Sequence, residues 1–315
     1  MPLALVFELW PHHQALELHA DSDEGLKLHT EPLQPLILLY YVPPAKSNTH
    51  PGAIVVRQGT TTPREFATVT LALDSLPNDN GTRSIFIFQG TYAEQILLMV
   101  IDTRHYRRVL HDYIGYTTDT TTYTGNQAII TACVPLSIAG SDDACGTLRI
   151  HKDDFDMYND NVKNTFGPAS QAIEISQYGS RVGLYACGFF GYQDTGAVDF
   201  IFGREGLVHF SVKGPGCIIA SGRESNDTGN CMHFENTVVL ASDAVSGTSG
   251  NIYLGRPWGD LEDIFFQSNT TGTGANGASR PSFATVLTAA ERASYSISSA
   301  VGSDYASWVD ALYII

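Results

Sequence analysis

Residues 191–203 read GYQDTGAVDFIFG, and the predicted fold and function both depend on this stretch. Its second half, residues 198–202, has the aromatic and β-branched composition of a buried strand. Two acids, Asp194 and Asp199, interrupt an otherwise uncharged run. Burying a carboxylate costs free energy unless it is hydrogen-bonded, paired or functional. Both acids are therefore candidate site residues, and the alternative is a structural Asp that accepts from backbone amides or pairs with an arginine.

A second motif, YLGRPW, occupies residues 253–258. Arg256 supplies a guanidinium that can orient a carboxylate, and Trp258 supplies a large ring that can stack on a sugar or pack in the core. Three motifs in this order resemble the signature of the pectin methylesterases, which are carbohydrate esterases. They are Gln193-Asp194-Thr195, residues 198–203 and residues 253–258. The resemblance covers roughly Gly52 to the C-terminus and is closest to fungal members.

The resemblance implies an all-β fold, a single-stranded right-handed parallel β-helix with short capping helices, like that of pectin lyases. The pattern of the chain agrees, because short strand-like runs separated by turn residues recur without long helices between them. Each coil of such a solenoid buries its face against its neighbours. Strands are predicted at residues 53–56, 84–88, 128–130, 147–150, 155–158, 172–175, 183–190, 207–212, 216–219, 232–240 and 252–254.

Two helices are predicted to close the ends of this solenoid. Residues 62–65, Thr-Pro-Arg-Glu, read as a capping box with proline at the first helical position. The helix that starts there would run to Pro77 with Phe66, Val69, Leu73 and Leu76 on one face. Residues 288–291 form a second capping box, and Trp308 with the final apolar residues is expected to seal the C-terminal side.

Residues 1–50 do not share this pattern and are interpreted as a divergent leader without an assigned function, ahead of an esterase-like domain over residues 51–315. The apolar run at residues 2–10 contains Glu8 and lacks a basic start, so it is not a convincing signal peptide. No apolar stretch is long enough to span a membrane, and no membrane partner is expected. The resemblance implies a secreted, extracellular, monomeric enzyme without a cofactor.

Composition restricts the partners of the protein. The 315 residues are 43% hydrophobic and 16% charged, which is typical of a folded, glycine-rich β protein. A formal net charge of −15 argues against nucleic acid as a partner and disfavours polyanionic polygalacturonate relative to neutral, methyl-esterified pectin. It also favours an acidic pH optimum. The five cysteines show no metal-ligand spacing, so a zinc site is not expected.

The resemblance assigns Asp199 as the nucleophile that attacks the C6 carbonyl of a methylated galacturonate. Asp194 would protonate the departing methanol and then activate water. The remaining site residues are Gln193 and Gln171 as oxyanion donors, Arg256 holding Asp199 ionised, and Trp258 and Phe202 as substrate-binding residues. For Gln171, an internal polar ladder is the alternative.

Other enzyme classes have less support. No Gly-x-Ser-x-Gly elbow is present for a Ser-His-Asp hydrolase, and His209 and His233 lie in strand-like runs. A pectate lyase or a polygalacturonase would need clustered acids. The candidate pairs Asp142-Asp143 and Asp153-Asp154 are predicted to be solvated turns.

The sequence departs from the family pattern in one place that bears on activity. Members of the family separate the two acid motifs by most of a coil, about 20 residues, whereas here Gly196 directly follows Thr195. Five extended residues would span about 16 Å and leave the two acids on opposite faces. A tight turn at Thr195-Gly196 would instead cost a strand pairing on each side.

A second segment is missing after Gln267, and residues 99–113 are unusually basic. We therefore expect very weak methanol release, and the alternative function is a catalytically impaired β-helix that only binds pectic polysaccharide.

Overall fold

The structure is a computed structural model, in which the chain divides into two compact units, Met1–Val42 and Pro43–Ile315. The described residues all belong to the second unit. They are 52–77, 82–99, 110–120, 122–192, 196–198, 202–203, 208–212, 214, 216–221, 232–234, 237–240, 246, 252–257, 264–266, 288, 290 and 303–310. In the strands that follow Gly191 the backbone is described without side chains, as it is at residues 110–112. In the described part of the chain, no helix is long and apolar enough to cross a membrane.

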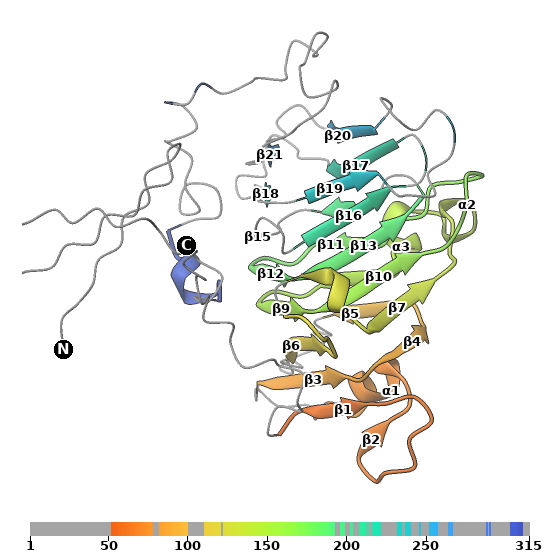
Figure 1. Ribbon diagram of the computed structural model, residues 1–315, viewed down its shortest axis with the longest axis vertical. Coiled ribbons are helices and arrows are strands. Elements are labelled where there is room, and N and C mark those ends of the chain that lie inside the picture. The colour runs from red at the N-terminus through yellow and green to blue at the C-terminus, as the bar shows by residue number, and fades with distance from the viewer. Residues whose placement is uncertain are drawn as a thin grey trace, which may run out of the picture. The chain divides into compact units, whose positions relative to one another are not determined.

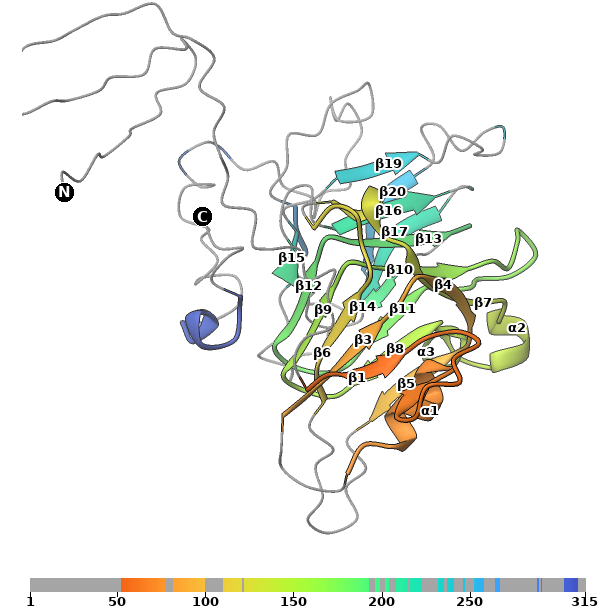
Figure 2. The ribbon, with the colours of Figure 1, turned by 60° about the horizontal axis from the view of Figure 1, so that its bottom comes forward.

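The described strands form three parallel sheets, here called A, B and C (Figures 1 and 2). Sheet A has the order β2-β1-β3-β6-β9-β12-β15-β18-β21, sheet B the order β19-β16-β13-β10-β7-β4, and sheet C the order β20-β17-β14-β11-β8-β5. From β3 to β21 the chain visits A, B and C in strict rotation, so three strands make one coil. This arrangement confirms the predicted parallel β-helix.

The strand bounds are as follows. Sheet A contains β1 (Ile54–Val56), β2 (Glu65–Phe66), β3 (Arg83–Ile87), β6 (Leu110–Gly115), β9 (Phe155–Tyr158), β12 (Val182–Tyr185), β15 (Phe202–Gly203), β18 (Met232–Phe234) and β21 (Ile264–Phe266). Sheet B contains β4 (Gly90–Ala93), β7 (Ala128–Ala132), β10 (Asp160–Asn164), β13 (Cys187–Gly191), β16 (Val208–Val212) and β19 (Thr237–Leu240). Sheet C contains β5 (Ile96–Met99), β8 (Leu148–His151), β11 (Ile175–Gln177), β14 (Gly196–Val198), β17 (Gly216–Ser221) and β20 (Ile252–Pro257).

Alternation of side chains along each strand separates the interior of the solenoid from its surface. In β8, Leu148 and Ile150 are fully buried in the core, whereas Arg149 and His151 point to the other face and are half-buried. The same period places Ile96 and Leu98 of β5 in the core. The interior is therefore a stack of aliphatic and aromatic rows contributed by all three sheets.

Changes of sheet divide three runs that the sequence presents as single strands. One of them, the predicted strand at 232–240, is split into β18 of sheet A and β19 of sheet B. The predicted strand at 183–190 is split into β12 and β13 by Ala186, whose φ of 52° lies in the left-handed region. Asn159, with a φ of 57°, occupies the equivalent corner between β9 and β10. The run 198–202 is divided in the same way, because Val198 ends β14 in sheet C and Phe202 begins β15 in sheet A.

The predicted N-terminal capping box is wrong, because the helix starts later. Arg64 has a φ of 71°, and Glu65 pairs as a strand residue with Val55. Helix α1 (Val69–Asp74) begins instead after Thr68, whose side chain accepts a hydrogen bond from the Leu71 amide. The Glu94 carboxylate accepts from two more free amides of the first turn, those of Val69 and Thr70, at 2.8 Å each.

The C-terminal segment packs against the side of sheet A, which corrects the expectation that it seals an end of the solenoid. The short helix η2 (Tyr305–Ser307) leads to Trp308 and Val309, which pack with a row of outward-facing residues of sheet A. That row consists of Phe86, Ile114, Tyr158 and Tyr185. Hydrogen bonds between Asp310 and the hydroxyls of Tyr158 and Tyr185, 3.0 Å each, hold the segment there. The predicted capping box at 288–291 lies mostly outside the described residues.

Candidate active site

Sheet C and the corner that leads into it organise the predicted site. Gln171 lies between β10 and β11, where the chain passes from sheet B to sheet C. In the sequence, Gln193 and Asp194 fall between β13 and β14, which is the same passage one coil later. Ile175 and Gly196 are strand partners in neighbouring coils, so their separation in the sequence is the length of one coil. Gln171 and Gln193 are separated by that length plus one residue. The spacing of the two glutamines therefore matches the length of one coil.

The backbone near Gln171 is fixed by the short helix α2 (Leu136–Ala139). The carbonyl of Gln171 accepts a hydrogen bond from the Leu136 amide at 2.7 Å, and the hydroxyl of Ser170 accepts from the Ser137 amide at 3.1 Å. Gln171 itself is half-buried. This part of the predicted site is thus tied to α2 by two hydrogen bonds.

The corner that precedes Gln193 is anchored from both neighbouring coils. Gly191 packs against the fully buried Glu174, and a Cβ at this glycine would collide with Glu174 Oε1, so no larger residue fits. One residue later, the carbonyl of Tyr192 accepts from the Gly214 amide of the following coil at 2.7 Å. Glu174 is thus a buried acid near Gln171 that the local sequence pattern does not indicate.

The shortened connection does not disturb the stacking of the strands. β13 pairs with β10 and β16 in sheet B, and β14 pairs with β11 and β17 in sheet C. Gly196 pairs with Ile175 of the preceding coil and with Ile219 of the following one. Both separations are about 20 residues, an ordinary repeat length for a solenoid. The expected loss of pairing is wrong, because Gly196 has a strand partner on each side and the chain changes sheet between Gly191 and Gly196. The path from Asp194 to Asp199 falls mostly outside the described residues, so the expected separation of the two acids stays a prediction.

Arg256 belongs to β20, in the same sheet as β14. The register runs from Ala197 through Ala220 to Arg256, so Arg256 is two strands away from Ala197, about 10 Å at the usual strand spacing. Phe202, in contrast, belongs to β15 of sheet A, where it pairs with Gly183 and His233. Their side chains, and all of Gln193, Asp194, Asp199 and Trp258, lie outside what the structure describes, and the roles of these residues stay predictions.

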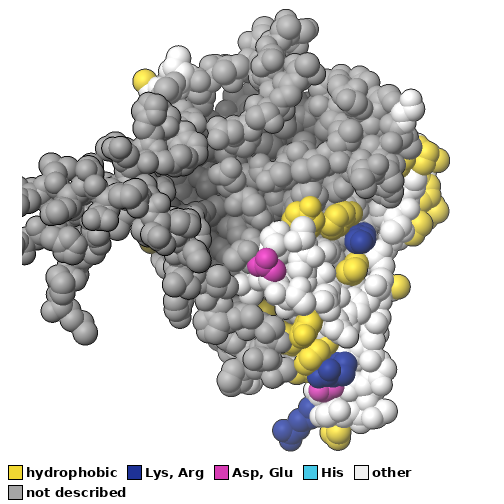
Figure 3. All heavy atoms as spheres, viewed as in Figure 1, with side chains coloured by type: hydrophobic (Ala, Val, Ile, Leu, Met, Phe, Trp, Pro, Cys, Tyr) yellow, Lys and Arg dark blue, Asp and Glu magenta, His cyan; other side chains and the backbone are white. Residues whose placement is uncertain are grey.

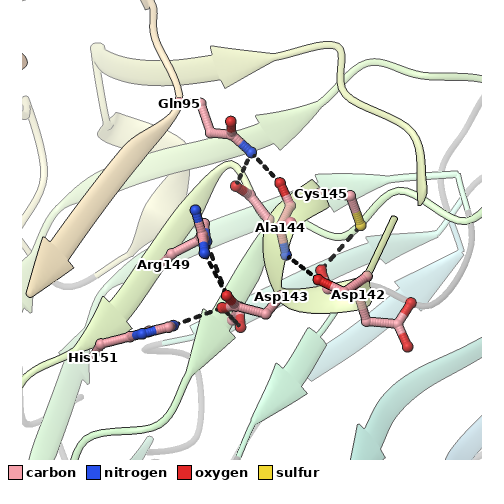
Figure 4. A network of polar contacts seen from close by, with 10 residues as sticks. Gln95, Asp142, Asp143, Ala144, Cys145, Arg149 and His151 are labelled. Atoms are coloured by element: carbon pink, nitrogen blue, oxygen red, sulfur yellow. Dashed lines mark hydrogen bonds and ion pairs between the residues drawn. The ribbon is translucent and has the colours of Figure 1, made fainter. Parts of the chain in front are cut away.

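A polar network on the outer face of sheet C went unrecognised in the sequence (Figure 4). It centres on Asp143 in helix α3 (Asp142–Cys145), which starts after the N-cap Ser141. Asp143 accepts hydrogen bonds from Arg149 Nε at 3.2 Å and Ser176 Oγ at 2.7 Å, and it lies 2.7 Å from His151 Nε2. The prediction that Asp142-Asp143 is a solvated turn is therefore wrong. Gln95 ties α3 to the sheet by donating to the carbonyls of Ala144 and Gly146.

The prediction of a solvated turn is confirmed for Asp153-Asp154, where both residues are exposed in a bend, but their carboxylates also have partners. Asp154 forms two hydrogen bonds with Arg181, at 2.5 and 2.7 Å, and Asp153 accepts from the Ser180 amide at 2.7 Å. Asp143, Asp153 and Asp154 thus each join neighbouring coils.

Electrostatics make Asp143 an unsuitable proton acceptor. Desolvation raises the pKa of its carboxyl, but the hydrogen bonds from Arg149, Ser176 and His151 outweigh this effect and lower the pKa to about 2. A carboxylate that remains ionised and fully engaged is a weak base and a weak nucleophile. The network therefore supports the sheet and positions its neighbours. Among the described residues there is no cluster of His, Cys, Asp or Glu that could hold a metal ion.

Comparison with known proteins identifies the family. The family model described as Pectinesterase matches residues 53–273. The chain belongs to the pectinesterase family. A pectinesterase from Aspergillus niger is 34% identical, with 84% of this chain and 92% of that protein covered. A pectinesterase from Aspergillus aculeatus is 32% identical, with 83% and 92% covered.

Solved structures agree with this membership of the pectinesterases. The deglycosylated pectin methylesterase from Aspergillus niger superposes with a TM-score of 0.66 at 26% identity, covering 85% of this chain and all of that one. The pectin methylesterase from carrot, at 17% identity and a TM-score of 0.59, shows the shared fold with 85% and 98% covered.

The alignment with the Aspergillus niger pectinesterase also shows that this chain lacks part of its relative. It spans 319 positions but covers only 84% of the 315 residues, so a substantial number of positions of that relative have no counterpart here. This difference supports the interpretation that internal segments present in relatives are missing.

Proposed function

We propose that this pectinesterase hydrolyses galacturonate methyl esters of pectin through Asp199 as nucleophile and Asp194 as general acid and base. The observation that carries the proposal is the register of sheet C, which puts Arg256 in line with Ala197 in the strand that leads to Asp199. The spacing of Gln171 and Gln193 by about one coil supports a shared oxyanion site.

In the first step, the Asp199 carboxylate attacks the C6 carbonyl carbon of a methylated galacturonate. The negative charge that develops on the carbonyl oxygen is stabilised by the side-chain amides of Gln171 and Gln193. Collapse of the tetrahedral intermediate breaks the bond to the methoxy group, and Asp194 gives its proton to the departing oxygen to form methanol. Asp199 is then joined to the sugar as an acyl anhydride.

In the second step, the ionised Asp194 takes a proton from water, and the resulting hydroxide attacks the C6 carbon. Asp199 leaves as a carboxylate, and Asp194 is again protonated. Arg256 keeps Asp199 ionised and oriented by a charge-assisted hydrogen bond, while Trp258 and Phe202 bind the sugar. The chain needs no cofactor for these steps. We place the protein outside the cell as a monomer, and its presence in culture medium with a monomeric sedimentation coefficient would test this.

The test of the proposal is methanol release from highly methylated pectin by the 315-residue chain, Asp199→Ala and Asp194→Asn. We expect no release by Asp199→Ala and a rate about 10²–10⁴-fold lower for Asp194→Asn, the usual worth of general acid–base help. Equal rates for all three proteins would contradict the assigned roles.

A second candidate, an impaired scaffold that only binds pectic polysaccharide, is favoured by the short spacing of the two acids along the chain. A displacement of about 1 Å can already cost 10²-fold in rate. Inserting a coil of about 20 residues between Thr195 and Gly196, taken from a relative, tests this candidate. Strong methanol release after the insertion, with none before it, would favour the impaired scaffold for the native chain. Equal release before and after would exclude it.

A further inference from the structure

The outer face of sheet C carries most of the exposed large hydrophobic side chains in the described part of the chain. In β5, Ile96 and Leu98 are buried, so the alternate residues Leu97 and Met99 lie on the outer face, 36% and 45% exposed. Tyr178, directly after β11, is 55% exposed. Two others, Leu71 of α1 and Ile138 of α2, lie elsewhere. Figure 3 shows separate hydrophobic side chains with few charged ones on the described surface in that view.

Strand register joins these side chains into one row. Met99 of β5 pairs with His151 of β8. The Tyr178 amide donates to the carbonyl of Ile150 at 2.8 Å, which continues the ladder and brings Tyr178 next to His151. The rings of His151 and Tyr178 meet edge to face with centroids 5.0 Å apart. The row Met99–His151–Tyr178 therefore crosses three neighbouring strands.

The Asp143 network holds this row in place. His151 is in contact with Tyr178 on one side and with the Asp143 carboxylate, 2.7 Å away, on the other. Asp143 is itself fixed by Arg149 and by Ser176, whose side chain is fully buried under α3. An exposed aromatic ring with such support is preorganised, so binding to it costs little conformational entropy.

The row also adjoins the strand that leads to the proposed nucleophile. Gln177, the residue before Tyr178, pairs with Val198, the residue before Asp199. Arg256 lies further along the same sheet, in line with Ala197. The aromatic row therefore lies on the sheet that also carries the strand before Asp199 and the strand of Arg256.

We infer that Tyr178, supported by His151 and flanked by Met99, is a stacking platform for a galacturonate ring of the pectin chain on the outer face of sheet C. The inference rests on the proposed function for its substrate. A pyranose ring has an apolar C–H face that packs on an aromatic ring and a polar rim that needs hydrogen bonds. The edge of this platform offers such groups, since Arg149 and His151 lie beside it on β8.

The test measures binding by calorimetry in an Asp199→Ala background, which prevents turnover, with a methyl-esterified galacturonate hexamer. Loss of an aromatic contact worth about 0.5–1.5 kcal/mol corresponds to a Kd about 2- to 12-fold weaker for Tyr178→Ala. Tyr178→Phe keeps the ring and should bind within about 2-fold of the parent. Leu71→Ala, a loss of exposed apolar surface on helix α1 and outside the row, is the matched control and should not change Kd. An unchanged Kd for Tyr178→Ala would overturn the inference.

A second measurement covers the case in which Tyr178→Ala does not fold. The ring resonances of Tyr178, assigned by their absence in Tyr178→Phe, should shift when the hexamer is added. Resonances that stay in place, or a parent protein that binds no hexamer, would overturn the inference. Binding that depends on Tyr178, without methanol release, would refute the proposed function and leave the inference standing. Methanol release with the same KM in the parent and in Tyr178→Ala would refute the inference and leave the proposed function standing.

Discussion

Asp160 provides a sharp test of how the interior of this β-helix is built. It begins β10 and is fully buried, and neither carboxylate oxygen has a hydrogen-bond partner among the described residues. Desolvation raises its pKa well above the ordinary value of 3.8. The pKa values of the nearby Tyr113 hydroxyl and Cys187 thiol are also raised, first by desolvation and then by Asp160. The substitution to study is Asp160→Asn, which keeps the shape and removes the titration.

The size of the effect of Asp160 on the free energy of unfolding follows from proton linkage. Below the ordinary pKa of 3.8 the carboxyl is protonated in both the folded and the unfolded protein, so it adds no pH dependence. As the pH rises above that value, the unfolded chain releases the proton while the folded protein keeps it. The free energy of unfolding then falls by about 1.4 kcal/mol per pH unit until the folded pKa is reached. The amide that replaces the carboxyl is buried without partners and adds a penalty of about 1–3 kcal/mol that does not vary with pH.

The assay is urea unfolding of both proteins between pH 3 and pH 8, followed by circular dichroism. The stability of Asp160→Asn relative to the parent should increase with pH above about 4, with a slope near 1.4 kcal/mol per unit. A difference that is constant across this range would refute the reasoning, because it would mean that Asp160 ionises as easily in the folded protein as in the unfolded chain.

Two further predictions concern local contacts. Thr68→Ala removes the N-cap hydrogen bond of α1 and should lower the free energy of unfolding by about 1 kcal/mol. Thr68→Ser keeps a capping hydroxyl and should retain most of that stability. Equal stability of the two variants would contradict the capping role of Thr68. The folded pKa of Asp143, about 2, is lower than its ordinary value, so its stabilising effect is present above about pH 3.8 and is lost as the pH falls toward 2. Asp143→Asn should therefore be less stable than the parent at pH 6 by about 1 kcal/mol, after allowance for solvent screening. In urea titrations this difference in the free energy of unfolding should shrink on acidification. A difference that grows instead would refute the lowered pKa of Asp143.

Local composition was enough to predict much of the fold. Residues 155–158 coincide with β9, and the short runs separated by turns correctly indicated a solenoid. Corners were missed where the residue has no turn preference. Ala186 adopts a left-handed conformation at the corner that Asn159 forms in the coil below it. The helix start was misplaced because Glu65 is held as a strand residue by its distant pairing with Arg57 and Val55, which no local pattern reveals.

The candidate site was harder to predict from the sequence, because its contacts also join residues that lie in different coils. Asp143 accepts a hydrogen bond from Ser176 of the following coil, and nothing in the local sequence around Asp143 indicates this distant contact. The run 198–202 has a uniform strand composition, yet it passes from sheet C to sheet A, since composition does not report where a coil bends.

The measurement that tests the central claim most directly is methanol release from highly methylated pectin by the native chain and by Asp199→Ala, at equal concentration and with matched circular dichroism spectra. We predict that the native chain releases methanol at a low rate, limited by the short connection between Asp194 and Asp199, and that Asp199→Ala falls to the rate of pectin without protein. Equal release by the two proteins would show that Asp199 is not the nucleophile and would contradict the account.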